Sequence, residues 1–97
     1  MDNNTIRWEK VTEEQFHKIL EDIPDLIRGI AETRVSKKAE SLIREANRWV
    51  IAEKDMVDAF FAETPKGFIP AMKNSMQALG IDYTKYGWHA YEFMKTK

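Results

Sequence analysis

The chain is 97 residues long, the size of one small domain. It contains no cysteine, so neither a disulfide nor a cysteine-ligated zinc or iron–sulfur site can form within it. Lys and Arg total 15 against 16 Asp and Glu, for a net charge of −1, which disfavours a nucleic-acid-binding protein. No apolar run approaches the ~18 residues of a membrane span, and the polar start does not resemble a secretion signal. We therefore expect a cytoplasmic protein that does not enter the membrane.

The first predicted helix spans Thr12–Asp22. Thr12 and Gln15 have the spacing of a capping box, in which each side chain bonds the backbone N–H of the other residue. The apolar positions that follow have helical spacing and predict a buried face: Phe16, Ile19, Leu20 and Ile23.

The longest predicted helix runs from Pro24 to Ala46, roughly 34 Å at 1.5 Å per residue. Pro24 suits the first turn, Asn47 suits a left-handed stop, and only Gly29 interrupts the helix-forming residues between them. Its length predicts that the other helices pack around it, with its two halves facing different neighbours. The expected buried positions are Leu26, Ile27, Ile30 and Ala31 in the first half, and Val35, Ala39, Leu42, Ile43 and Ala46 in the second. On this basis Ile30→Asp should unfold the domain.

The remaining segments predict further helices and no strand. Trp49–Ile51 is a short apolar connector, and a third helix is expected over Glu53–Phe61, after a poor cap at Ala52. A fourth is expected over Pro65–Leu79, ended by Gly80, and a short one over Trp88–Met94. The fold class is therefore all-α: a compact four-helix domain around the long central helix, with a short C-terminal helix, in a single domain covering residues 1–97.

No pattern in the sequence indicates an active site. His17 and His89 lack metal-ligand spacing, and the acidic pairs Glu13-Glu14 and Glu21-Asp22 suit helix ends and solvated faces. There is no Gly-rich phosphate loop or Gly-x-Ser-x-Gly elbow. We expect no catalytic residue, no metal and no cofactor, and hence no enzyme.

Two surfaces are candidates for binding. Arg34 and Lys38 belong to a basic side of the central helix, where interleaved Glu40 and Glu45 favour a solvated face over a DNA-binding one. Near the C-terminus the chain gathers apolar side chains that either fold back on the core or dock on a partner: Trp88, Tyr91, Phe93 and Met94.

A family resemblance comes from one run of residues. Trp8, Glu13-Glu14, Leu20, Ile23-Pro24, Arg28-Gly29, Ala31, Ala39, Ile51 and Met56-Val57-x-Ala59 resemble the small C-terminal helical domain of the light-independent protochlorophyllide reductase B subunit, which also occurs in stand-alone proteins. The similar part covers residues 8–59, and residues 64–97 form an extension outside it. The sequence departs from the family at Asn47, usually Gly, and at Ala52, usually Thr.

The resemblance implies an accessory module that lacks the reductase's catalytic domains. Pro24, Arg28 and Gly29 match the family pattern, and we expect structural roles for Pro24 and Arg28. Pro24 would start a helix, and Arg28 would pair with an acid such as Glu32 or one on a neighbouring helix.

Three functions follow, in order of preference. The first is a non-catalytic interaction domain that binds a protein partner or forms a homo-oligomer. The second is a binder of a flat apolar small molecule, such as a tetrapyrrole, for which no cofactor-binding residue is assigned. The third is a DNA-binding helical domain. A cavity of ~300 Å³ or more beside Phe68, Met72 and Trp88 would favour the second, and an exposed apolar patch the first.

Overall fold

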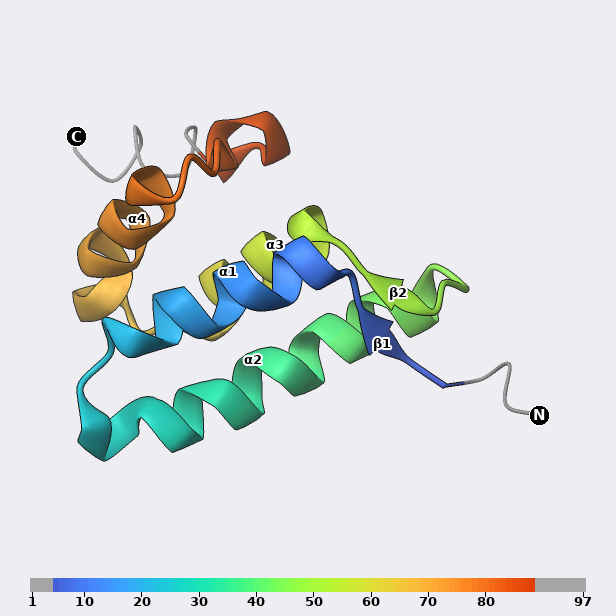
Figure 1. Cartoon of the computed structure of the whole chain (residues 1–97), viewed down its shortest axis with the longest axis horizontal. Helices are drawn as coiled ribbons and strands as arrows, with labels where there is room; N and C mark the ends of the chain where they lie inside the picture. Colours follow the sequence, from blue (N-terminus) through green and yellow to red (C-terminus); the bar gives the residue numbers. More distant parts are fainter. Residues whose placement is uncertain (1–4, 89–97) are drawn as a thin grey trace.

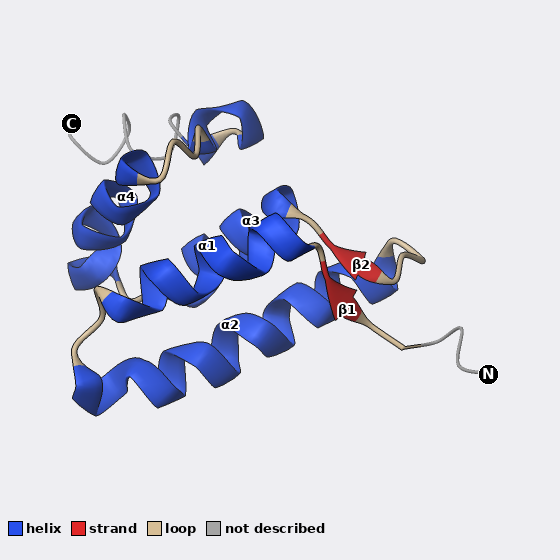
Figure 2. Ribbon diagram, viewed as in Figure 1, coloured by secondary structure: helices blue, strands red, loops and turns tan. Residues whose placement is uncertain are grey.

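The computed structural model describes residues 5–88 and confirms the all-α fold class. Its helices are α1 (Lys10–Glu21), α2 (Asp25–Glu45), α3 (Glu53–Glu63) and α4 (Ile69–Ala78), with 3-10 turns η1 (Lys66–Phe68) and η2 (Tyr83–Tyr86). Two short strands, β1 (Arg7–Trp8) and β2 (Val50–Ile51), complete the described part (Figures 1 and 2). α1 and α2 run in opposite directions, and α4 stands across the end of this pair that is farther from the strands (Figure 1).

The predicted central helix is confirmed as one unbroken α2 that passes through Gly29. Pro24 precedes its first turn with φ −53°, the value that the proline ring imposes. At the other end Asn47 has a positive φ of 60°, and the Arg48 N–H donates to the Ile43 carbonyl at 2.8 Å. This is the left-handed stop expected from the sequence.

The core forms around the second half of α2. Val35, Ala39 and Ile43 are at most 2% exposed. They pack with buried residues from the other helices, among them Phe16, Ile19 and Leu20 of α1, Met56, Val57, Ala59 and Phe60 of α3, and Met72 and Met76 of α4.

The prediction that the first half of α2 is also core was wrong for two residues. Leu26 is 91% exposed and Ile30 is 57% exposed, and no residue of α2 before Val35 is fully buried. The reason lies in the placement of α4, which packs mainly against α1 and makes few contacts with α2. The central helix is therefore covered along only part of its length.

The absence of strands was also predicted wrongly. β1 and β2 pair in parallel, and the chain continues the ladder where the Arg7 N–H donates to the Trp49 carbonyl and the Glu9 N–H to the Ile51 carbonyl, at 3.0 and 2.9 Å. Two residues are too few to show an alternating pattern, so this pairing leaves no signal in the sequence.

The start of the first helix was misplaced by two residues. The β1 ladder holds the chain extended as far as Glu9, and α1 begins directly afterwards at Lys10. Thr12 is buried inside the first turn, where its hydroxyl donates to Glu9 Oε1 at 2.8 Å. The predicted capping box between Thr12 and Gln15 is therefore wrong.

The fourth helix is shorter than the predicted Pro65–Leu79. Pro70 cannot lie in a helix interior, because its ring removes a backbone N–H and clashes with the preceding turn. The chain instead makes the η1 turn and starts α4 at Ile69, so that Pro70 falls in the first turn. Gly80, with φ of 77°, ends this segment as expected.

The third helix begins at Glu53 as predicted and is capped from within. Ala52 has no acceptor side chain, but Asp55 Oδ2 accepts from the Ala52 N–H at 2.9 Å. The other oxygen of the buried Asp55 accepts from the Arg48 guanidinium at 2.5 Å, and this hydrogen bond raises the pKa of Arg48. Arg48 thus anchors the connector between α2 and α3 to the first turn of α3.

Candidate functional site

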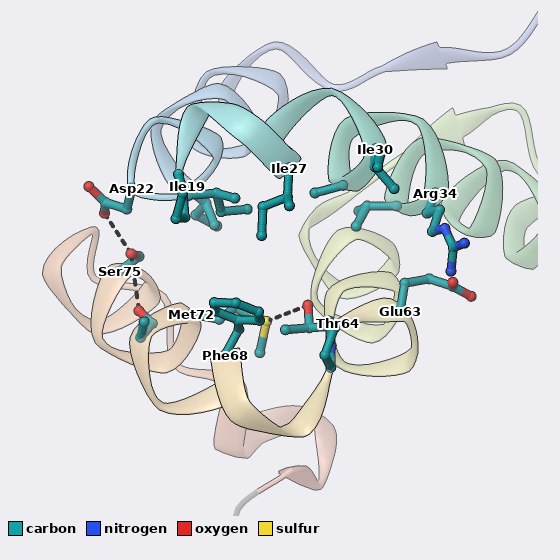
Figure 3. Close-up of a pocket in the computed structure, with 16 residues that line it drawn as sticks. Ile19, Asp22, Ile27, Ile30, Arg34, Glu63, Thr64, Phe68, Met72 and Ser75 are labelled. Carbon is teal, nitrogen blue, oxygen red and sulfur yellow. Dashed lines mark hydrogen bonds between the residues drawn. The ribbon is translucent and has the colours of Figure 1, made fainter.

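A groove of about 510 Å³ lies between the first half of α2 and the segment that runs from the end of α3 into α4 (Figure 3). We call it the α2–α4 groove. Its volume falls within the ~300–1,000 Å³ typical of small-molecule pockets. It exists because α4 leans on the end of α1 and makes few contacts with α2.

The walls of the groove are mostly apolar. Ile27, Ile30 and Ala31 contribute from α2, and Phe68 and Met72 face them from η1 and α4 (Figure 3). The other apolar lining residues are Ile19, Ile23, Pro24, Val35, Pro65 and Ala71. Ile30 and Phe68 are 57% and 44% exposed, so the groove opens to solvent between them.

Polar groups gather toward the two ends of the groove. At one end the Ser75 hydroxyl donates to Asp22 Oδ2 at 2.6 Å, which ties α4 to the end of α1. Arg34 and Glu63 lie toward the other end (Figure 3). Thr64 donates to the Met72 sulfur at 3.3 Å. An occupant of this groove would need an apolar centre with polar groups toward its ends.

Arg28 closes the turn that leads into the groove. Its Nε donates to the Leu20 carbonyl at 2.8 Å, and one terminal nitrogen lies 2.9 Å from the Ile23 carbonyl oxygen and 3.2 Å from that of Glu21. They lie at or just beyond the last turn of α1, where the Leu20 carbonyl also accepts from the Ile23 N–H at 3.0 Å. The other terminal nitrogen pairs with Asp25 at 2.8 Å, and not with the expected Glu32.

Nothing among residues 5–88 explains why position 29 is a glycine. A Cβ added there would meet nothing within 4 Å, and its φ is not in the left-handed region. Glycine inside a helix costs about 0.5–1 kcal/mol relative to alanine. The residue therefore leaves open space on the exposed side of α2.

The candidate surface residues fall in different places. Trp88 stacks on Phe61 with ring centroids 4.5 Å apart, and its Nε1 donates to Asp58 Oδ1 at 2.9 Å. It is thus half-buried on α3, away from the groove and not on an exposed patch. Arg34 lines the groove, and Lys38 follows one turn later on α2. Tyr91, Phe93 and Met94 lie outside the described residues, as does all of the predicted short helix after Trp88.

The groove brings together only part of what the sequence suggested. Phe68 and Met72 meet there as expected of the proposed ligand site, and Trp88 does not. Sequence reasoning missed the Asp22–Ser75 contact, because these residues are 53 positions apart and neither belongs to a motif. The sequence also did not predict that Ile27 lines an open groove. Apolar residues at helical spacing predict a buried face, and the spacing does not tell whether another helix covers that face.

Within residues 5–88, no three His, Asp or Glu side chains gather in a metal-binding arrangement. No helix in that range has the length and apolar character needed to cross a membrane.

Of three comparisons with known proteins, one found a match. Neither the curated proteins nor the solved structures gave a match. A protein-family comparison matched residues 1–90, nearly the whole chain, to the family described as "Protein of unknown function (DUF2621)". The chain therefore belongs to the DUF2621 family.

Proposed function

We propose that this protein is a non-catalytic interaction module, and that the α2–α4 groove with its exposed rim binds a protein partner. The proposal extends the resemblance to the accessory domain of the light-independent protochlorophyllide reductase B subunit. The observation that carries it is a groove of about 510 Å³ bordered by large apolar side chains that face solvent.

The apolar rim favours a macromolecule as the occupant. Leu26, at 91% exposure, does not line the groove, yet it lies one helical turn before Ile30, which does. Leu26 therefore extends the apolar surface beyond the cavity, whose opposite wall carries the exposed Phe68. Burial of a side chain such as Leu26 contributes about 1.5–3 kcal/mol, and the described residues offer it no cover. A partner helix laid in the groove would supply this cover.

Site-specific photo-crosslinking in the native host tests the proposal. A photoreactive amino acid at position 30 or 68 should give the same covalent adduct with one protein, identified by mass spectrometry. Position 11 is the matched control, because Val11 is 60% exposed on α1 and does not line the groove. Equal adducts at all three positions, or none at 30 and 68, would refute a groove-specific partner.

The groove volume also favours a second candidate, a flat apolar ligand such as a tetrapyrrole. In that case native mass spectrometry of the purified protein would detect a small bound molecule, or added protoporphyrin IX would bind. Ile30→Asp should abolish this binding, and Val11→Asp should leave it unchanged. Loss of binding in both variants, or in neither, would place the ligand outside the groove.

A further inference from the structure

We propose that the partner docks an acidic amphipathic helix, whose apolar side chains fill the α2–α4 groove and whose carboxylates pair with Arg34, Lys37 and Lys38 of α2. The inference rests on the proposed function and states the chemistry of its partner. Its basis is the charge of the surface that continues the groove along α2.

The exposed side of α2 changes from apolar to basic along its length. Leu26 and Ile30 are exposed in its first part, and Arg34 and Lys37 are exposed in the turns that follow. At 3.6 residues per turn, these four side chains fall within about 80° of one another around the helix axis. Lys38 comes seven residues after Ala31, and two turns of helix bring it back to the line of α2 that faces the groove. The apolar groove therefore leads into a basic surface.

The basic side chains outnumber the acidic ones at this end of the groove. Among residues 5–88, none of Arg34, Lys37 and Lys38 forms an ion pair. The acidic residues of α2 all lie outside the sector occupied by Leu26, Ile30, Arg34 and Lys37: Asp25, Glu32, Glu40 and Glu45. On the opposite wall, Glu63 is the one acidic lining residue toward this end (Figure 3). The excess of positive charge is complementary to a partner that carries carboxylates.

The spacing along α2 sets the pattern expected in the partner helix. Arg34, Lys37 and Lys38 follow Ile30 by four, seven and eight residues, roughly 6 to 12 Å along the axis. A helix laid in a groove anchors itself through apolar side chains at i, i+3 or i+4, and i+7. Its acidic side chains should therefore lie within about two helical turns of the anchor that contacts Ile30, and on one side of that anchor in the sequence.

An anionic bilayer matches this face less well than a helix does. Ile27 and Met72 lie on the walls of a groove, which a flat surface does not fill. The groove also carries the carboxylates of Asp22 and Glu63 toward its two ends, and anionic headgroups would be repelled by both. A helix can enter the groove and place its carboxylates beside the basic residues alone.

The photo-crosslink from position 30 identifies the segment that occupies the groove. Proteolysis and tandem mass spectrometry of the adduct locate the crosslinked residue in the partner. We expect a segment with apolar residues at helical spacing and at least two Asp or Glu residues within about eight positions of the crosslink. A segment without such carboxylates would overturn the inference.

Charge reversal tests the pairing with a synthetic peptide that covers the crosslinked segment. Fluorescence anisotropy measures its affinity for the full chain. Arg34→Glu/Lys37→Glu should weaken binding by about tenfold or more, and the affinity of the parent should fall as the salt concentration rises. Both positions are exposed, and circular-dichroism melts check that the variant folds.

The matched control is Lys10→Glu/Lys18→Glu. It changes the net charge by the same amount, at exposed positions of α1 that do not line the groove. Because these charges are remote from the bound peptide and screened by salt, the control should change the affinity by less than about threefold. Equal weakening in the two double variants would show that only the net charge matters, which contradicts the proposed pairing.

A charge-swapped peptide separates ion pairing from a loss of structure. When its acidic residues are replaced by lysine, the peptide should bind Arg34→Glu/Lys37→Glu more tightly than it binds the parent. A merely misfolded variant would bind neither peptide. A swapped peptide without this preference would refute the contact between carboxylates and the basic residues.

The two proposals fail in distinguishable ways. The absence of adducts at positions 30 and 68 contradicts the interaction module and the acidic helix together. An adduct whose peptide is indifferent to Arg34→Glu/Lys37→Glu contradicts the acidic helix and retains the interaction module. If instead the full chain binds vesicles of phosphatidylcholine and phosphatidylserine, and the double variant does not, the basic residues serve a membrane surface and the inference is overturned.

Discussion

Arg28 shows how one side chain can fix the join between two helices. It contacts three backbone carbonyls at the end of α1 as well as Asp25. Arg28→Ala should lower the free energy of unfolding by about 1–2 kcal/mol, mainly through the lost charged hydrogen bonds, since the exposed Asp25 pair adds little. Arg28→Lys should recover only part of this, because an ammonium group lacks the planar fork of donors.

Urea denaturation measures this loss, with Arg44→Ala as the control. The Arg44 side chain is exposed on α2, and its guanidinium lies 4.0 Å from a Glu40 carboxylate oxygen, at the outer limit of an ion pair. Its replacement should change stability by no more than about 0.5 kcal/mol. An Arg28→Ala variant as stable as Arg44→Ala would show that the carbonyl contacts are not needed.

Tyr86 couples stability to alkaline pH. Burial raises its pKa, and so does the hydrogen bond that its hydroxyl donates to Glu53 at 2.6 Å. The folded state therefore keeps the phenol proton above pH ~10, where the unfolded chain releases it. This stabilisation is complete below the unfolded pKa and is lost as the pH rises toward the folded one, by up to about 1.4 kcal/mol per pH unit. Unfolding measured between pH 8 and 11 should show a steeper alkaline loss in the parent than in Tyr86→Phe, and identical slopes would contradict the assignment.

At the scale of the element, the two halves of α2 should differ in whether they tolerate a charged substitution. Val35 is 2% exposed against the other helices, whereas Ile30 is 57% exposed at the groove. Val35→Asp should abolish cooperative unfolding, because it buries an unpaired charge. Ile30→Asp, the same chemistry about one turn earlier, should melt within a few degrees of the parent. Circular-dichroism melts compare the two, and a collapse of Ile30→Asp would show that this half of α2 belongs to the core after all.

The sequence predicted elements well where the signal is local. The uninterrupted α2, the left-handed Asn47 and the start of α3 at Glu53 all follow from residues within a few positions of each feature. The start of the fourth helix was predicted wrongly, although a local residue indicates it: Pro70 cannot lie in a helix interior, so the helix must begin just before it. The strands could not be predicted, because two-residue segments pair across the chain without a pattern of their own.

At the scale of the whole molecule, the groove results from how helices are placed and not from any motif. Apolar spacing in α2 predicted that Ile27 faces inward, but the packing of α4 on α1 decides that a space remains between Ile27 and Met72. The Asp22–Ser75 hydrogen bond that supports this placement joins residues 53 positions apart. The exposure of Leu26 and Ile30 could therefore be learned only from the structure, and it supports the proposed function.

The central claim is that the exposed face of α2 is covered when the protein is in its cell, and cysteine accessibility tests it most directly. Single cysteines at positions 26, 30 and 11 of the cysteine-free chain are labelled with a maleimide, in intact cells and in dilute purified protein. We predict that all three react readily when dilute and that 26 and 30, but not 11, are protected in cells. Labelling in cells that is as fast at 26 and 30 as at 11 would contradict the account.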